Sequence, residues 1–342
     1  MKLSIIIPAF NEEVGIEQNI AEIESYMNSY AGHVQWELIV VNDGSQDGTL
    51  VVLNNIAQEK TWLKVVDLVF NYGRGRALRA GFDCALGDEI VTLDADLSYA
   101  PYHIERMLSK LEEENADIVI ASAYGKNGTV QDVPWKRFLL SRIGNQVLSY
   151  MFSGGITVLT CVARAYRGEF IKQLDLHSDD KEIHLEILAK AKTLGAKIVE
   201  VPADLHWREE KKSKSVSGGP PMRRSTVRTR KTSSSHLFFA LLNKPGMIFW
   251  VPGFFLLGIS TIIFIIILLT ILSDPLVTIS LYHALRDSMI SASISWLVMA
   301  FSFLLCIQFF TLGFLTNQSK AHQEENYRTL HAIYQVLKDK RE

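Results

Sequence analysis

The sequence predicts an α/β protein in which a mostly parallel sheet is followed by two transmembrane helices. Short β-branched runs alternate with longer amphipathic stretches over residues 1–205, which is typical of parallel strands joined by helices. Two later stretches, Met247–Leu272 and Ser288–Ser319, contain no charged residue. Because about 20 apolar residues cross the hydrocarbon core of a bilayer, each stretch is long enough to span it. We therefore expect an integral membrane protein; two buried core helices are the less favoured alternative, since soluble helices seldom run so long without charge.

The expected strands are short apolar runs, and the expected helices lie between them. The strand candidates are Leu3–Ile7, Glu37–Val41, Leu63–Leu68, Glu89–Leu93, Ile118–Ala121 and Lys197–Val201. The helix candidates are Glu13–Tyr30, Leu50–Glu59, Ala77–Ala85, Tyr102–Glu114, Trp135–Phe152 and Glu182–Leu194. A short run around Thr157–Arg164, assigned to neither class, lies between the last two helices. Sheets of this kind bind ligands outside the carboxyl ends of their strands, so chemistry is expected at that edge.

Composition excludes several classes of protein. The 342 residues carry 35 basic and 37 acidic side chains, a net charge of −2, which argues against a protein that coats nucleic acid. Cys84, Cys161 and Cys306 are odd in number and far apart, so neither a disulfide framework nor a zinc site is expected. The chain has no Gly-x-x-x-x-Gly-Lys-Ser/Thr phosphate loop and no Gly-x-Ser-x-Gly nucleophile turn.

The C-terminal part divides by charge. Residues 207–245 form a basic juxtamembrane segment, in which His236–Asn243 is expected as a short amphipathic helix at the membrane surface. The expected segments after it are a transmembrane helix, a short external loop, a second transmembrane helix and a C-terminal helix: residues 246–272, 273–287, 288–317 and 318–342. Because basic residues favour the cytoplasmic side, we expect residues 1–206 and both termini to be cytoplasmic, on a multi-pass protein of the cell (inner) membrane.

Asp94 and Asp96 follow an apolar strand and are the candidate metal ligands. On an extended chain, residues two apart point to the same side, so the two carboxylates would repel unless a cation lay between them. Mg²⁺ or Mn²⁺ takes oxygen ligands and commonly bridges one or two carboxylates to substrate phosphates. The alternative is a solvated turn that holds two acids.

Two further polar turns follow the first two expected strands. Residues 8–12 follow the first strand and residues 42–45 the second, so both fall on the same edge of the sheet as Asp94. Asp43 could accept hydrogen bonds from a base or a ribose, and Phe10 could pack on a nucleobase. Ordinary turn chemistry explains either segment alone, whereas three polar turns at one edge favour a ligand site.

Residues 71–79 supply glycines and three arginines, Arg74, Arg76 and Arg79, just before an expected helix. Backbone amides at a helix start, together with arginine, suit a diphosphate. The stretch is not a dinucleotide fingerprint, because it follows the third strand and lacks the third glycine at the required offset.

The succession of these motifs resembles family 2 glycosyltransferases of the GT-A fold. The segments that carry the resemblance are Ser4–Pro8 with Asn11 and Glu12, Val41–Ser45 with Asp47–Thr49, Asn71–Gly73 with Gly81, and Leu93–Leu97. Three later features narrow it to polyprenyl-phosphate glycosyltransferases, similar to dolichol-phosphate mannose synthases and bacterial undecaprenyl-phosphate glucosyltransferases. These features are Arg164–Arg167, Glu200–Pro202 and the two apolar spans.

The resemblance implies a GT-A (Rossmann-like, mostly parallel sheet) catalytic domain at residues 1–206 and a role for each motif. Asp94 and Asp96 would be catalytic and would face Mg²⁺ or Mn²⁺ and the diphosphate. The residues expected to hold the nucleotide-sugar are Pro8, Phe10, Glu12, Asp43 and Arg79. The candidates for gripping the lipid phosphate near the membrane surface are Arg137, Ser141, Arg208 and Lys214.

The chain departs from the family that it resembles at three positions. Val158 stands where relatives usually carry an Asp regarded as the catalytic base. Ala123 stands where relatives tend to have Arg, and Ser98 where they tend to have Gln. A phosphate monoester with a second pKa of about 6 is already largely ionised at neutral pH, so it needs no strong general base. We expect Val158 to shape the site while the acceptor phosphate attacks unaided.

The function that these features imply is inverting transfer of one sugar from a nucleotide-diphosphosugar to polyprenyl phosphate at the cytoplasmic leaflet, in glycosylation of the cell envelope. UDP-glucose is the preferred donor and GDP-mannose the next. One alternative is a non-catalytic membrane scaffold that binds nucleotide sugar. A processive polysaccharide synthase is less favoured, because His206-Trp207-Arg208 is not the Gln-x-x-Arg-Trp motif of those enzymes. The expected partners are the donor, the acceptor and membrane lipid but no nucleic acid, and the exposed spans leave room for a homo-oligomer.

Overall fold

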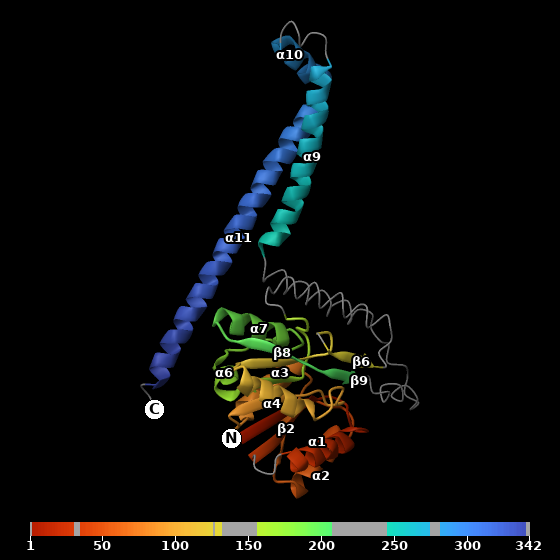
Figure 1. Ribbon diagram of the computed structural model, residues 1–342, viewed down its shortest axis with the longest axis vertical. Coiled ribbons are helices and arrows are strands. Elements are labelled where there is room, and N and C mark those ends of the chain that lie inside the picture. Colours follow the sequence, from red (N-terminus) through yellow and green to blue (C-terminus); the bar gives the residue numbers. More distant parts are fainter. Residues whose placement is uncertain are drawn as a thin grey trace. The chain divides into compact units, whose positions relative to one another are not determined.

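The structure is a computed structural model that describes residues 2–30, 35–125, 127–131, 156–206, 245–273 and 281–339 (Figure 1). The chain divides into two compact units, Met1–Ala240 and Leu241–Glu342. The helices expected at Trp135–Phe152 and His236–Asn243 lie outside the described residues.

The first unit is built on a seven-stranded sheet with the order β3-β2-β1-β4-β7-β5-β8. Its strands are β1 (Lys2–Ala9), β2 (Gln35–Asp43), β3 (Leu63–Leu68), β4 (Glu89–Thr92), β5 (Ile118–Ser122), β7 (Arg164–Arg167) and β8 (Ile198–Pro202). All pairings are parallel except those of β7, which runs antiparallel between β4 and β5. Two short strands, β6 (Thr129–Gln131) and β9 (Asp204–His206), pair separately. The mostly parallel α/β fold is confirmed; β7 is a strand that the sequence did not indicate.

Helices connect the strands, and all of them except α6 overlap a helix that the sequence predicts. They are α1 (Ile16–Tyr30), α2 (Thr49–Glu59), α3 (Arg74–Cys84), α4 (His103–Glu113), α6 (Gly168–Gln173) and α7 (Ile183–Thr193). The helix α4 shows why these stretches form helices: its apolar residues recur at helical spacing and make one buried face. These residues are Ile104, Met107, Leu108 and Leu111. The interior strand β1 is largely apolar on both faces, as in sheets covered on both sides.

The strand order places a topological switch point between β1 and β4. The chain passes from β1 to β2 and β3 on one side of β1, and then returns through α3 to β4 on the other side. At such a point the loops that follow the two strands separate, and a crevice opens outside their carboxyl ends. The polar segments after Ala9 and Thr92 therefore flank the expected ligand site.

The second unit is a helical hairpin of α9 (Gly246–Leu272) and α11 (Ser293–Asp339), with the short α10 (Leu281–Ser291) between them in sequence. Four buried residues of α9 recur every seven positions: Gly246, Gly253, Ser260 and Ile267. This spacing, with small residues at the contact, is typical of left-handed packing between membrane helices. The Ser260 hydroxyl donates a hydrogen bond of 3.2 Å to the Met299 carbonyl of α11.

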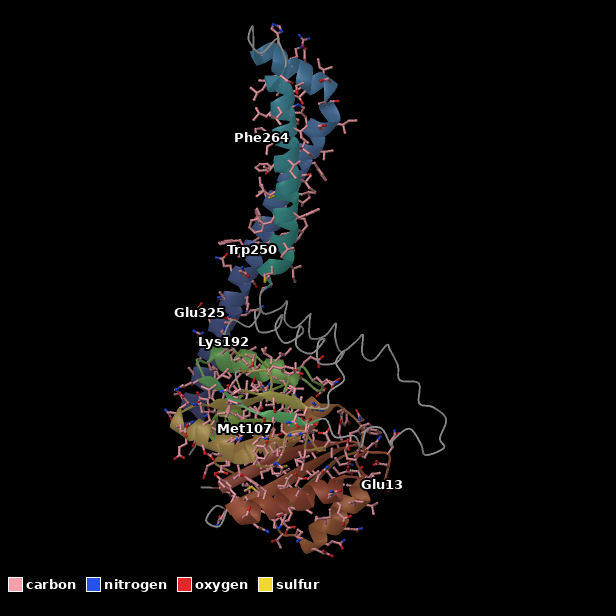
Figure 2. All side chains as sticks on the ribbon, turned by 45° about the vertical axis from the view of Figure 1, so that its right-hand side comes forward. Glu13, Met107, Lys192, Trp250, Phe264 and Glu325 are labelled. Carbon is pink, nitrogen blue, oxygen red and sulfur yellow. The ribbon has the colours of Figure 1, made fainter. Side chains whose placement is uncertain are left out.

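Away from this contact the hairpin is apolar and exposed. Trp250 and Phe264, labelled on α9 in Figure 2, are 39% and 49% exposed. The spans Gly246–Leu272 and Ser293–Ile333 are long and apolar enough to cross a membrane. The second differs from the sequence expectation: the helix begins at Ser293 instead of residue 288, because residues 281–291 form their own helix. It then continues without a break into the part expected as a separate C-terminal helix.

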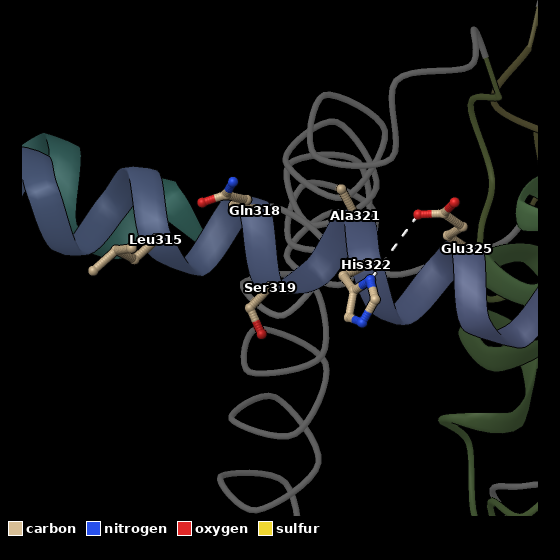
Figure 3. Close-up of a pocket in the computed structure, with 6 residues that line it drawn as sticks. All are labelled: Leu315, Gln318, Ser319, Ala321, His322 and Glu325. Atoms are coloured by element: carbon tan, nitrogen blue, oxygen red, sulfur yellow. Dashed lines mark ion pairs between the residues drawn. The ribbon is translucent and has the colours of Figure 1, made fainter.

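Figure 3 shows where α11 changes from apolar to polar. Leu315 is 52% exposed, and Gln318 and Ser319 follow within the next turn. Beyond them the His322 Nδ1 atom lies 4.0 Å from the Glu325 Oε2 atom, one helical turn along. The helix continues without a break through this change in its side chains.

Candidate functional site

The loops that follow β1 and β2 are joined by reciprocal hydrogen bonds. The Asn11 amide donates to the Ser45 hydroxyl at 3.0 Å, and the Gln46 amide donates to the Asn11 side-chain oxygen at 2.8 Å. The Glu12 amide donates to the Thr49 hydroxyl at 2.9 Å. Asn11 has a φ of 54°, a left-handed conformation that asparagine tolerates better than most residues. The predicted convergence of these two turns is confirmed.

Asp43, the last residue of β2, is almost fully buried and holds the loop that follows β3. Its two carboxylate oxygens accept hydrogen bonds from the amides of Tyr72 and Gly73, both at 2.9 Å. Burial raises the pKa of the Asp43 carboxyl, and the two amides oppose that shift. Asp43 therefore holds the loop that follows β3, and this role is independent of any contact with a nucleotide.

The other residues predicted to contact the nucleotide lie on the first loop and its strand. Pro8 is half-buried in β1, and Phe10, just after the strand, has 37% of its surface exposed. Glu12 is half-buried, and its carbonyl accepts the amides of Gly15 and Ile16 at the start of α1. Their contacts with a nucleotide stay predictions.

Asp94 and Asp96 sit on a tight turn at the switch point, and the physical reason given from the sequence is wrong. The strand ends at Thr92, and the amide of Leu97 donates to the Asp94 carbonyl at 3.1 Å, which closes a four-residue turn. Leu97 has a φ of 45°. Strand alternation therefore does not relate the two carboxylates; the turn does. Ser98 orients Asp96, because its amide and hydroxyl both donate to Oδ1, at 3.1 and 2.6 Å.

Two side chains hold this turn: Arg74, which the sequence offered only as one of three arginines for a diphosphate, and Asn19, which the sequence did not single out. Arg74, the first residue of α3, places its Nη2 atom 3.4 Å from Asp94 Oδ1. Asn19 of α1 is buried and donates from Nδ2 to the Ala95 carbonyl at 2.8 Å, in the middle of the turn. The signal for Asn19 was present in the sequence, because it occupies the apolar stripe of its helix beside Ile16, Ile20 and Ile23.

The turn fits a divalent cation of the Mg²⁺ type. Two carboxylates stand two residues apart, and one of them already faces a positive group in Arg74. Among the described residues no three His, Cys, Asp or Glu side chains group together as a complete protein cage. Mg²⁺ is usually held by one or two carboxylates and completed by substrate phosphates and water, so two ligands are sufficient.

The glycines of residues 71–79 serve packing, which the diphosphate interpretation did not anticipate. Gly73 has a φ of 109°, and a Cβ atom there would lie 2.6 Å from the Asp179 carbonyl oxygen. A Cβ atom at Gly75 would lie 2.4 Å from the Ser178 carbonyl oxygen. The start of α3 therefore lies directly against residues 178–180, where any side chain would collide with backbone.

Arg79 is engaged by the same loop. Its Nη1 atom donates to the His177 carbonyl at 2.8 Å and to Asp179 Oδ1 at 3.0 Å. Its predicted contact with the nucleotide stays a prediction. Arg137, Ser141, Arg208 and Lys214, predicted to bind the lipid phosphate, lie outside the described residues.

Val158 is buried in a loop that two charged residues hold. Glu200 of β8 accepts the amides of Thr157 and Val158 at 2.7 and 2.9 Å. Arg164 is fully buried and donates to the carbonyls of Leu159 and Cys161. The site offers an apolar side chain where the resemblance family has an acid. Ala123, the second departure, is buried as well.

Cys161 lies close enough to Asp94 to feel its charge. Burial and the Asp94 carboxylate raise the pKa of the Cys161 thiol to about 11. At neutral pH the thiol is protonated, so it is not a nucleophile.

Comparison with known proteins gives a consistent result. The family model "Glycosyl transferase family 2" matches residues 4–175. A polyprenol monophosphomannose synthase of Mycolicibacterium smegmatis is 31% identical over 60% of this chain and 77% of its own. A dodecaprenyl-phosphate galacturonate synthase of Rhizobium johnstonii is 33% identical over 52% of this chain and 51% of its own. An undecaprenyl-phosphate 4-deoxy-4-formamido-L-arabinose transferase of Enterobacter sp. is 31% identical, over 62% of each chain.

A solved structure with bound ligands is also similar, more loosely. The mannosyltransferase PcManGT from Pyrobaculum calidifontis, in complex with GDP-mannose and Mn²⁺, is 15% identical with a TM-score of 0.41. The match covers 90% of this chain and 86% of that one. Its nucleotide and its ion are described for that protein.

Proposed function

This chain belongs to glycosyl transferase family 2, and from that premise we propose that it transfers a single sugar, with inversion, from a nucleotide-diphosphosugar to polyprenyl phosphate at the cytoplasmic leaflet. The proposed donor is UDP-glucose, with GDP-mannose next. The observation that carries the proposal is the Asp94–Asp96 turn at the switch point of the sheet, in a chain that ends in an apolar helical hairpin.

The relatives support this acceptor. All three named above carry a polyprenol or polyprenyl phosphate in their names, although two of them match over only 51% and 62% of their own length. The three names differ in the sugar, so the donor is argued separately. An acceptor dissolved in the membrane also explains why the catalytic unit is tethered to spans: tethering turns a search in solution into a local one.

The residues of the site divide the work of transfer. Asp94 and Asp96 would hold the divalent ion, which when bound acts as a Lewis acid on the departing diphosphate. Asn19 and Ser98 keep the two carboxylates in place through the Ala95 carbonyl and Asp96 Oδ1. Fixed groups of this kind lower the barrier, because they need not reorganise as charge develops on the leaving group.

The acceptor needs no strong base from this chain. A phosphate monoester has a second pKa of about 6, so its attacking oxygen is already ionised at neutral pH. An apolar Val158 is compatible with such a nucleophile, and we expect Val158→Asp to change turnover less than about tenfold. Val158→Asn, of similar volume without the charge, is the matched control. A rise of many orders of magnitude in Val158→Asp alone would mean that the natural role is not transfer.

A second candidate is a non-catalytic membrane scaffold that binds nucleotide sugar. The apolar Val158 also favours this second candidate. Its side chain is 3% exposed and its amide donates to Glu200, so position 158 offers no carboxylate to an acceptor. The two candidates differ in one outcome, since a scaffold binds the donor but leaves its sugar in place.

One experiment separates them. The full chain, reconstituted in nanodiscs with polyprenyl phosphate and Mn²⁺, is given radiolabelled UDP-glucose or GDP-mannose, and label is measured in the organic phase. Transfer predicts labelled lipid that depends on Asp94. A donor that raises the thermal midpoint without ever labelling the lipid, across a panel of UDP- and GDP-sugars, would support the scaffold.

A further inference from the structure

The start of α3 places the guanidinium of Arg74 on the turn that would hold the metal ion. The geometry points to Arg74 as an exchangeable counter-cation: it neutralises Asp94 when no donor is present, and it moves to the donor's diphosphate when the divalent ion binds. The inference rests on the proposed function only in taking a nucleoside diphosphate as the ligand.

The backbone that carries Arg74 is held on both sides, so only its side chain is able to move far. Asp43 accepts the amides of Tyr72 and Gly73, the two residues before it. Gly73 lies against the Asp179 carbonyl so closely that a Cβ atom would be 2.6 Å from it. Asp43 therefore fixes the backbone just before Arg74, whose guanidinium reaches Asp94.

The contact between Arg74 and Asp94 has the features of a pair that can exchange. The Nη2–Oδ1 distance is 3.4 Å, longer than a charge-assisted hydrogen bond, and the two side chains are 36% and 21% exposed. Partly exposed pairs of single charges contribute little to stability. A divalent ion carries twice the charge of the guanidinium and repels it, so the ion displaces Arg74 from Asp94.

The neighbouring arginines are placed differently. Arg79 is tied to the His177 carbonyl and to Asp179, and its side chain is only 22% exposed. Arg76 is exposed, and its backbone amide donates to the Asp179 carbonyl at 3.0 Å. Of the three arginines in residues 74–79, all of them described, Arg74 is the one in ion-pair contact with the metal-binding turn.

A nucleoside diphosphate reverses the relation between Arg74 and the metal ion. Without it, both cations compete for Asp94. With it, the diphosphate supplies negative charge for both, and the planar fork of arginine suits paired phosphate oxygens. By linkage, Arg74 must then weaken metal binding in the first state and strengthen it in the second.

The test measures Mn²⁺ binding to the full chain in nanodiscs by the free-ion EPR signal, without acceptor lipid and without turnover. We expect Arg74→Gln to bind Mn²⁺ about fivefold more tightly than the unaltered chain when nucleotide is absent. In the presence of UDP or GDP, whichever tightens Mn²⁺ binding in the unaltered chain, the same variant should bind the ion about fivefold more weakly. In each state, the Mn²⁺ affinity of Arg74→Lys should fall between those of the unaltered chain and Arg74→Gln, because lysine keeps the positive charge and lacks the planar guanidinium.

Arg76→Gln is the matched control, since it removes the same charge two residues away on the exposed side of α3. If it reproduces both changes, a general field effect is at work and the inference is overturned. The inference is also overturned if Arg74→Gln changes the Mn²⁺ affinity in the same direction with and without nucleotide, or if it leaves that affinity unchanged in both states. If the reversal appears and labelled lipid never does, the inference stands and the proposed transfer fails alone.

Discussion

Acidic residues lie at both ends of the parallel strands, here called the two edges of the seven-stranded sheet, and their surroundings differ. At the carboxyl-end edge, Asp43 accepts two backbone amides and Asp94 faces Arg74. At the opposite edge, Glu89 begins β4 and lines a cavity of about 410 Å³ together with Asp88 and other residues. Its Oε2 atom is buried and accepts no hydrogen bond from any residue that the structure describes. Burial, and then the charge of Glu112, raise the pKa of Glu89 to about 7.

This difference shows which surroundings allow a group of acidic residues to attract a cation. Backbone amides and a guanidinium favour the charged form of a carboxylate, and at Asp43 the two amides oppose the effect of burial. Burial without donors favours the neutral form, and a neutral acid does not attract a cation. Acidic residues alone therefore do not mark a metal site in this protein. The donors around them distinguish the two edges.

The largest expected effect contrasts the two edges directly. Asp94→Asn should lower transfer of label into lipid about 10²–10³-fold, because the divalent ion that would stabilise the leaving diphosphate loses a carboxylate ligand. Glu89→Gln, the same change of an acid to its amide at the other edge, should leave transfer close to that of the unaltered chain. Equal losses in the two variants would remove the functional distinction between the edges.

The buried support of the Asp94–Asp96 turn comes next in size. Asn19→Leu leaves the Ala95 carbonyl without its donor and should cost about 1–3 kcal/mol of unfolding free energy, measured by denaturant titration. It should also weaken Mn²⁺ binding, which a purely structural role would not do. Asn54→Leu, on the exposed face of α2, is the control and should change neither quantity. Unaltered Mn²⁺ affinity in Asn19→Leu would show that the turn holds its shape unaided.

Glu89 should make stability depend on pH. Its pKa is about 7 in the folded protein and 4.5 as a model value, so its favourable contribution is fully present below pH 4.5 and is lost as the pH rises through 7. Glu89→Gln should therefore raise the thermal midpoint at pH 8 and have little effect at pH 4.5. A midpoint difference between the two chains that is the same at both pH values would contradict this assignment.

The smallest expected effect concerns an exposed acid near the same edge. Glu114 pairs with Lys110 and Lys197 at 3.0 and 2.9 Å, and these lysines lower its pKa to about 2. Its contribution is present above pH 4.5 and is lost as the pH falls through 2, the opposite sign to Glu89. At pH 7 Glu114→Gln should shift the thermal midpoint only slightly, less in high salt, with Glu113→Gln as control. A large, salt-independent shift would show that exposure is not what separates Glu114 from Glu89.

The sequence by itself determined the local elements and the edge at which the polar turns meet. The expected strand Leu63–Leu68 has the same bounds in the structure, and the expected helix Leu50–Glu59 differs from α2 by one residue. Apolar spacing and charge-free length are properties of short windows, so they survive folding. The first apolar span was placed within one residue for the same reason.

Only the tertiary structure decided what surrounds the functional groups. The strand β7 lies between β4 and β5 although it begins 75 residues after β4 begins, and no local pattern indicates that pairing. The Asn19 bond to Ala95 joins residues 76 apart, and Gly75 is required by a carbonyl at residue 178. Arg74 reaches Asp94 for the same reason: the partners are chosen by the sheet order, which brings together chain segments that no short window of sequence contains.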